Sequence, residues 1–193
     1  MIETSEFIGN SCTSNGGAIH MYGGDMAVDR CLIALNSAVW RGGGVHVRNA
    51  ATLSVTQSTF SDNSGEEGGN LSAVFGGQCT IESSILSFAG EGASVYCNAG
   101  SYDLSCSNVY GNVGGDWPSC VSAEEGASGN FSLDPAFCDT SAQDYSIDFA
   151  SPCSDGNHPD SLPCGLIGAY APACGGATAT ETVSWGALKE MFR

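Results

Sequence analysis

Two short stretches that lie 26 residues apart carry the side chains best suited to binding chemistry. His20 and Tyr22 occur in "IHMY", and His46 and Arg48 occur in "VHVR". Imidazole, phenol and guanidinium groups combine flat faces with hydrogen-bonding atoms, a combination that suits a surface for sugars. We therefore expect these four residues to form one polar and aromatic patch, provided that the two stretches lie side by side.

Trp40 and Arg41 precede the second stretch by a few residues and are expected on a corner close to the same patch. Together with the four residues above, they are the candidate ligand-binding set. The alternative interpretation is that all six are ordinary exposed residues of strands and corners.

Carboxylates are the other candidates for chemistry, because a glycoside hydrolase needs two of them on either side of a sugar bond. A polysaccharide lyase would need calcium-bound carboxylates beside an Arg or Lys base. Glu66 and Glu67 are adjacent, so on an extended segment their side chains would point apart, and solvated turn acids are the simpler interpretation. Asp25 and Asp29 have no evident partner.

We expect no cofactor, and the alternative is a calcium site. The residues between 118 and 175 contain several aspartates that could supply oxygen ligands, but no Asp-x-Asp-x-Asp-Gly loop. These aspartates are Asp134, Asp139, Asp144, Asp148 and Asp155.

Ten cysteines in 193 residues, without metal-binding spacing, indicate structural disulfides and an oxidising compartment. Proximity in sequence favours Cys106–Cys120, Cys138–Cys153 and Cys164–Cys174, with Cys12–Cys31 and Cys79–Cys97 as further candidates along the first part of the chain.

The charge and the missing motifs exclude several classes of function. A formal charge of −16 makes nucleic acid an implausible partner, since phosphates require clustered cations. No CxxC, HExxH, P-loop or GxSxG motif occurs. No stretch approaches the roughly 18 apolar residues of a membrane span, and the first 20 residues do not form a leader peptide, so we expect a truncated start. The five basic residues are Arg30, Arg41, Arg48, Lys189 and Arg193.

An internal repeat of about 26 residues must position the candidate side chains in the first part of the chain. One column of it contains Asn10, Asn36, Asn63, Ala89 and Asn112, with steps of 26, 27, 26 and 23 residues. Large apolar residues precede each member by three and by eight positions. The first apolar column is Phe7, Ile33, Phe60, Leu86 and Val109, and the second is Ile2, Val28, Val55, Ile81 and Leu104.

A unit of this size with short alternating segments cannot bury its own apolar face, so it must stack on its neighbours. The absence of helical periodicity and of a leucine-rich pattern favours an all-β fold, a right-handed single-stranded parallel β-helix of about five coils. Asn suits a left-handed corner and a hydrogen-bonded ladder, which Ala89 would interrupt. The glycine pairs at 16–17, 42–44 and 68–69 predict a second corner.

The segments "FIGNSCTSNGGAI", "IALNSAVWRGGGV" and "FSDNSGEEGGNL" resemble the FxxN and GGA(I/L/V) motifs of polymorphic outer membrane protein repeats. More broadly, they are similar to bacterial right-handed parallel β-helix proteins. The resemblance covers residues 1–117 and weakens at "LSFAGEGASVY" and "VYGNVGGDW". It implies a bacterial protein of the outer membrane or cell surface, and it says more about architecture than about activity.

The predicted domain boundary follows from a change in composition, because the prolines lie after the repeats and six of the ten cysteines lie between residues 106 and 174. Residues 1–117 are expected to be β-helix coils, and residues 118–175 a Cys-rich terminal coil and cap that covers the open end of the solenoid. Residues 176–193 are expected to be a flexible linker and a short tail, with Trp185, Leu188 and Phe192 on one face. One interpretation of that tail is sorting or surface attachment, and the other is a disordered tail or a helix docked on the cap.

These observations predict a non-catalytic secreted or surface β-helix for adhesion, surface structure or glycan binding. Its partners would be surface glycans or other cell-surface proteins, and it would be a monomer or part of a longer chain. The alternative function is a polysaccharide lyase or glycoside hydrolase of the β-helix type.

Overall fold

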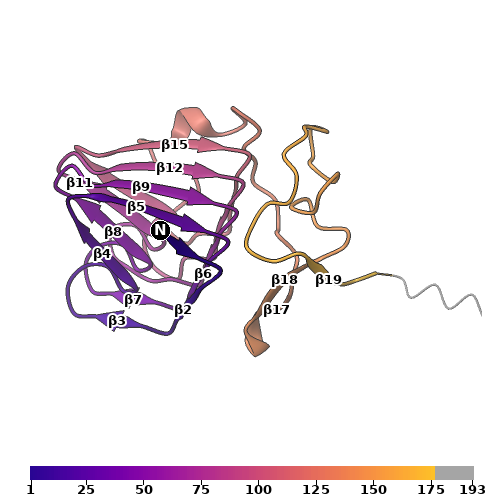
Figure 1. The fold of residues 1–193 in the computed structure, drawn as a ribbon, viewed down its shortest axis with the longest axis horizontal. Helices are drawn as coiled ribbons and strands as arrows, with labels where there is room; N and C mark the ends of the chain where they lie inside the picture. The colour runs from indigo at the N-terminus through magenta and orange to yellow at the C-terminus, as the bar shows by residue number, and fades with distance from the viewer. Residues whose placement is uncertain (177–193) are drawn as a thin grey trace, which may run out of the picture.

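The structure is a computed structural model that describes residues 1–176, and it is a right-handed parallel β-helix with an irregular disulfide-rich C-terminal part (Figure 1). The chain winds so that each of four coils adds one strand to each of three parallel sheets, and a fifth coil adds strands to the first two sheets. The first sheet contains β1 (Ile2–Glu3), β5 (Asp25–Asp29), β9 (Thr52–Thr56), β12 (Gln78–Glu82) and β15 (Ser101–Ser105). The second contains β2 (Glu6–Ile8), β6 (Leu32–Ala34), β10 (Thr59–Ser61), β13 (Ile85–Ser87) and β16 (Asn108–Tyr110).

The third sheet and the C-terminal elements complete the part of the chain that the structure describes. The third sheet contains β4 (Ile19–Tyr22), β8 (Val45–Arg48), β11 (Leu71–Val74) and β14 (Val95–Asn98), and a short pair joins β3 (Ser11–Cys12) to β7 (Ser37–Ala38). The C-terminal part contains the 3-10 turns η1 (Ser122–Glu124) and η2 (Thr140–Ala142) and a small sheet of β17 (Phe137–Asp139), β18 (Asp144–Asp148) and β19 (Pro172–Cys174).

The two predicted apolar columns are confirmed, because their members lie in register in neighbouring strands. Val28 pairs with Val55, and Val55 pairs with Ile81, along the first sheet. Ile33, Phe60 and Leu86 stack in the same way along the second sheet. All six side chains are at most 1% exposed and belong to one core cluster inside the coils. The hydrophobic effect along this column holds each coil on the next.

The Asn column forms the predicted ladder in the first three coils. Asn36 accepts a hydrogen bond at its Oδ1 from Asn10 Nδ2 at 2.9 Å, and Asn63 does the same for Asn36 at 3.0 Å. Each of these Oδ1 atoms also accepts the backbone N–H of the Asn one coil below. Buried amides are therefore satisfied by their own repeat.

Asn70 carries the ladder across the coil in which Ala89 replaces the Asn. Asn63 Nδ2 donates to Asn70 Oδ1 at 2.9 Å, and Asn70 Nδ2 donates to Asn112 Oδ1 at 3.0 Å. Asn70 is fully buried, and the small side chain of Ala89 leaves room for it in this column. The interruption predicted at Ala89 is thus bridged by a residue from the neighbouring corner.

The left-handed conformation at this corner belongs to the residue before each Asn, which corrects the sequence-based expectation. Leu35 has φ of 60° and Asp62 has φ of 55°, while Asn36 and Asn63 are not among the positive-φ residues. A further corner that the sequence did not predict has a ladder of its own. There Ser58 N donates to Ser84 Oγ, and Ser84 N donates to Ser107 Oγ.

The predicted glycine corner is confirmed, and close backbone approach is its main reason. A Cβ on Gly17 would lie 2.1 Å from the carbonyl oxygen of Gly43, and one on Gly43 would lie 2.3 Å from that of Gly69. Gly16, Gly42 and Gly68 also have positive φ. A side chain at these positions would push neighbouring coils apart.

Residues 117–133 extend the last coil over the end of the solenoid. Trp117 and Val121 pack against the central core, and Phe131 N donates to Ser107 O at 3.0 Å. Asn130 Oδ1 accepts the backbone N–H of Ser107 and so continues the Ser ladder. These contacts continue the coil pattern beyond β16 and cover part of the end of the core.

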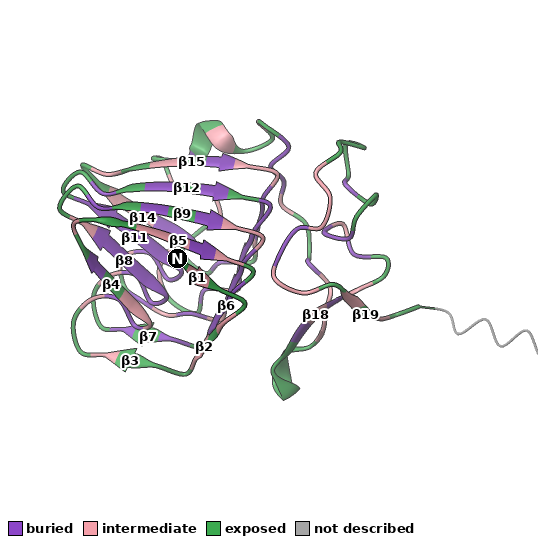
Figure 2. Ribbon diagram, viewed as in Figure 1, coloured by how far each residue is buried: buried purple, intermediate pink, exposed green. Residues whose placement is uncertain are grey.

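Residues 134–174 lie along the side of the solenoid rather than over its end (Figure 1). Ile147 and Ile167 pack on Ile85, which points outward from the second sheet, and Tyr145 packs on Leu32. The three middle strands of the second sheet, β6, β10 and β13, are consequently buried on both faces. Figure 2 shows in purple how the buried residues gather in the strands of the solenoid. This lateral position differs from the predicted cap over the end.

Three disulfides form, and they correct every pairing expected from the sequence. The bonds are Cys97–Cys120, Cys106–Cys164 and Cys138–Cys174, while Cys12, Cys31, Cys79 and Cys153 are free. The expected pairs Cys106–Cys120, Cys138–Cys153, Cys164–Cys174, Cys12–Cys31 and Cys79–Cys97 are therefore wrong. Cysteines that are only part of a coil apart lie on different sides of the solenoid, as Cys79 in β12 of the first sheet and Cys97 in β14 of the third sheet do. Sequence proximity is therefore a poor guide to pairing there. Three disulfides fit an oxidising compartment.

Candidate functional site

The outer face of the third sheet brings together the residues that the sequence singled out. Parallel pairing in register places His20 beside His46 and Tyr22 beside Arg48. Side chains that alternate along a strand point to opposite faces, so inward Val45 and Val47 leave His46 and Arg48 on the outer face. The predicted patch therefore exists as a geometric arrangement.

His46 forms the buried centre of this face. Its ring meets that of His20 edge-on at 4.9 Å between centroids, and its Nδ1 is hydrogen-bonded to Ser72 Oγ at 2.6 Å. Burial, together with the charges of His20, Arg48 and Arg41, lowers the pKa of His46 to about 4. Burial and then Arg48 also lower the pKa of His20. Both rings are thus mainly neutral at pH 7.

The contact between His46 and Ser72 is structural rather than nucleophilic. His46 is 1% exposed and Ser72 is fully buried, so no substrate atom reaches the hydroxyl. A base with a pKa of about 4 is also poorly matched to activating a hydroxyl near neutral pH. The pair fixes two neighbouring strands in place.

Arg48 lies between two aromatic rings, and we call this group the Tyr22–Arg48–Phe75 cluster. The guanidinium carbon is 5.2 Å from the centre of the Tyr22 ring and 5.3 Å from that of Phe75. Tyr22 is 68% exposed and Phe75 is 56% exposed. Sequence reasoning missed Phe75, because it lies at the corner directly after β11, where the alternation of inward and outward residues ends. The preceding coils also have no aromatic residue at the equivalent position.

Trp40 and Arg41 occupy the opposite end of the third-sheet strands. Arg41 pairs with Glu67 in the next coil, and its guanidinium carbon lies 5.7 Å from the centre of the Tyr96 ring. Trp40 is 56% exposed on the same corner. Arg41 is therefore compensated by Glu67, whereas no carboxylate of the described residues lies within ion-pair distance of Arg48.

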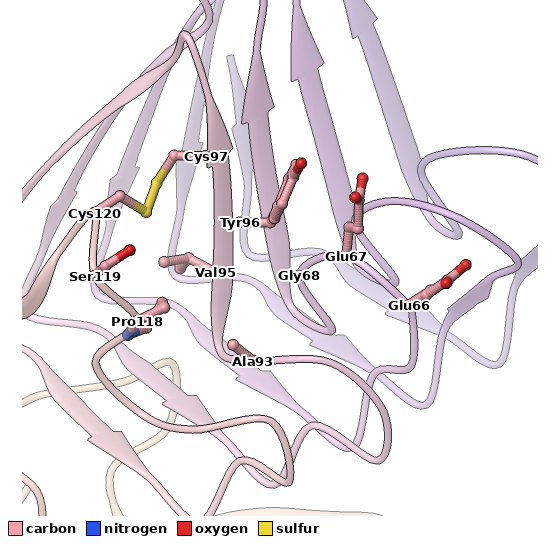
Figure 3. A pocket seen from close by; sticks show the side chains of 10 residues that line it. All are labelled: Glu66, Glu67, Gly68, Ala93, Val95, Tyr96, Cys97, Pro118, Ser119 and Cys120. Atoms are coloured by element: carbon pink, nitrogen blue, oxygen red, sulfur yellow. A yellow bond between two sulfur atoms is a disulfide. The ribbon is translucent and has the colours of Figure 1, made fainter.

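A shallow pocket of about 280 Å³ lies beside this corner (Figure 3). The Cys97–Cys120 disulfide and Pro118 form one side of it, and Glu66, Glu67 and Tyr96 form the other. Glu67 is engaged by Arg41, and Glu66 is the next residue on the same turn. The two carboxylates thus line one wall and do not face each other across a cleft.

The aspartates considered for calcium act in separate local turns. Asp134 accepts the N–H of Ala136, and Asp148 accepts that of Ala150, while Asp139 and Asp144 accept in the same way two residues on. Across the described residues, His, Cys, Asp and Glu side chains form no group of three or more that could hold a metal ion. Asp29 pairs with Arg30, its neighbour in sequence.

Within residues 1–176, no helix has the length and apolar character that crossing a bilayer requires. The predicted tail residues Trp185, Leu188 and Phe192 lie outside the described residues.

Comparison with known proteins finds no family model, no curated sequence and no solved structure that matches this chain. The outer face of the third sheet is therefore identified as the candidate site from its geometry alone.

Proposed function

We propose that the protein is a non-catalytic, secreted or cell-surface β-helix that binds glycans through the Tyr22–Arg48–Phe75 cluster. The observation that carries the proposal is that two exposed aromatic rings flank one guanidinium on a sheet face. Exposed aromatic rings give a sugar an apolar platform, and a planar guanidinium donates hydrogen bonds to its oxygens.

The spacing within the cluster supports an extended ligand. Tyr22 is in register with Arg48, and Arg48 is in register with Val74, the residue before Phe75. Coils are separated by about 4.8 Å, so the two rings lie on either side of Arg48 along the solenoid axis. A glycan chain that runs along this axis would meet ring, guanidinium and ring in turn.

Rigidity also favours binding at this place. Tyr22 and Arg48 belong to strands whose backbone hydrogen bonds run into the neighbouring coils, so little conformational entropy is lost when a ligand binds. Tyr and Phe side chains have only two rotatable bonds, which keeps the entropy cost of ordering them low.

The proposed cellular location rests on features of the whole chain rather than on the Tyr22–Arg48–Phe75 cluster. Disulfides, a formal charge of −16 and the resemblance to polymorphic outer membrane protein repeats support a bacterial surface or secreted location. Adhesion or surface assembly would then follow from contacts with surface glycans.

The test is binding to a panel of neutral and acidic polysaccharides by affinity electrophoresis and calorimetry. We expect Tyr22→Ala and Phe75→Ala each to weaken binding by about 5- to 10-fold, since one stacked ring contributes about 1 kcal/mol. The matched control is Val113→Ala, which removes a 76% exposed apolar side chain elsewhere.

Unchanged binding in both aromatic variants, with intact thermal unfolding, would remove the cluster from the function. The appearance of reducing ends or unsaturated sugars in the same incubations would favour the polysaccharide lyase or hydrolase instead.

A further inference from the structure

We infer that the Tyr22–Arg48–Phe75 cluster selects glycans that carry a carboxylate, namely uronic-acid sugars, with Arg48 as the group that recognises the acid. This inference rests on the proposed glycan-binding function and specifies its ligand class.

The first observation is an imbalance of charge at Arg48. Arg30 has Asp29 at 2.9 Å, and Arg41 pairs with Glu67. Among the side chains of residues 1–176, no carboxylate lies within ion-pair distance of Arg48. An uncompensated arginine is unusual in a chain with 21 acidic and five basic residues.

The second observation is the surroundings of the guanidinium. The guanidinium carbon lies over both the Tyr22 and the Phe75 ring, and among residues 1–176 the buried Nε of Arg48 has no hydrogen-bond partner. Aromatic neighbours exclude water, and charge–charge attraction is stronger where water is excluded. An external carboxylate would therefore interact more strongly with Arg48 than with an arginine in open water.

The third observation is that the positive field of Arg48 reaches its neighbours. After burial, the charge of Arg48 contributes to the lowered pKa of His20, and it also contributes at His46. Both imidazoles are mainly neutral at pH 7 and Arg41 is compensated by Glu67, so among the described side chains this face offers one unmatched positive charge, that of Arg48.

One positive charge between two stacking rings fits a sugar that has one negative charge on its ring. A carboxylate accepts two parallel hydrogen bonds from a guanidinium, which fixes its orientation as well as its position. The overall negative charge opposes any anion at long range, but at physiological ionic strength it is screened beyond about 8 Å. Contact with Arg48 therefore dominates once the sugar is seated.

The experiment compares a galacturonic-acid tetrasaccharide with its methyl ester, which has the same rings without the charges. Binding is measured by calorimetry on the full chain at pH 7 and 150 mM NaCl, that is, at about the ionic strength of the screening argument. We expect the acid to bind about tenfold more tightly than the ester. Arg48→Gln should remove this preference, so that acid and ester bind the variant with about equal affinity.

Three outcomes would overturn the inference. Equal affinity of the unaltered protein for acid and ester would leave glycan binding by the aromatic rings intact but would exclude acid selection. A preference that persists in folded Arg48→Gln would move acid recognition to another residue. Failure of both ligands and of the neutral panel to bind would reject the inference together with the proposed function. Because the two ligands are compared on the unaltered protein, the test is decisive even if the variant does not fold.

Discussion

His46 shows how one side chain can couple the binding face to pH. Its imidazole is held neutral by burial and by the charges around it, while its Nδ1 is hydrogen-bonded to Ser72. Protonation would place a second positive charge beside Arg48 in a water-poor setting. The same contacts that arrange the face therefore make it sensitive to acid.

We expect the free energy of unfolding to fall as His46 becomes protonated in the unfolded chain. The folded pKa of about 4 lies below the ordinary value of 6.5, so this contribution is fully present above pH 6.5 and is lost between pH 6.5 and 4. Urea unfolding at pH 7 and pH 5 should show the unaltered protein losing about 2 kcal/mol more than His46→Asn. Equal losses would show that His46 titrates normally in the folded state.

Asn63 is the residue whose loss should harm the coils most. It accepts hydrogen bonds from the backbone and side chain of Asn36, and it donates to Ile33 O and Asn70 Oδ1. Asn63→Ala leaves these buried groups unsatisfied, and we expect urea unfolding to show a loss of about 3–5 kcal/mol. Asn10→Ala, at the exposed end of the ladder, should cost about 1 kcal/mol. Similar losses in both variants would contradict a cooperative ladder.

At the scale of elements, the second sheet differs from the other two because residues 134–174 cover its outer face. Tyr145 donates to Asp62 Oδ2 at 3.0 Å, and Gly168 N donates to Ser83 O at 2.8 Å. The packing of Ile147 and Ile167 on Ile85 adds a second apolar layer. The C-terminal segment thus acts as a lateral brace along the coils.

Gly168 provides the sharpest test of this packing. It has φ of 100°, and a Cβ there would lie 2.7 Å from Ile85 Cδ1 and 3.0 Å from Thr59 Oγ1. We expect Gly168→Ala to lower the free energy of unfolding by about 2–3 kcal/mol and to speed hydrogen exchange in residues 134–174. Gly165→Ala is the control, because a Cβ at Gly165, with φ of 68°, meets no atom within 4 Å. If both variants lose the same amount, the close packing of Gly168 on the second sheet is incorrect.

At the scale of the whole molecule, two disulfides join the C-terminal part to the coils. Cys97–Cys120 links β14 to the terminal coil, and Cys106–Cys164 links the corner after β15 to the lateral segment. Cys138–Cys174 closes the lateral segment on itself. The solenoid and its brace are therefore one covalently linked unit.

Peptide mapping under non-reducing conditions should recover these three bonds, and alkylation after denaturation should label Cys12, Cys31, Cys79 and Cys153. The double variant Cys106→Ser, Cys164→Ser opens a loop of 58 residues and should lose about 4 kcal/mol of unfolding free energy in the chain-entropy model. Cys12→Ser, which changes a free thiol, should lose less than about 1 kcal/mol. Any mapped bond between Cys12 and Cys31 would contradict the structure.

The spacing of residues alone determined the stacked coils, the inward columns and the meeting of His20 with His46 and of Tyr22 with Arg48. In a parallel β-helix, residues one coil apart become neighbours in register, so separation in sequence translates directly into position. The bond Cys97–Cys120 obeys this rule, since its separation of 23 equals the last step of the Asn column. That spacing was the signal that could have identified it.

Only the tertiary structure decided the features that do not repeat. Phe75 covers Arg48 from a corner, Asn70 fills the column at Ala89, and residues 134–174 settle on the side of the second sheet. The strands of the second sheet are three residues long, so each has too few outward residues for their apolar character to predict that the outer face is buried. The contacts of a non-periodic segment depend on how its shape fits the surface it packs against. The spacing of residues in the sequence therefore does not predict them.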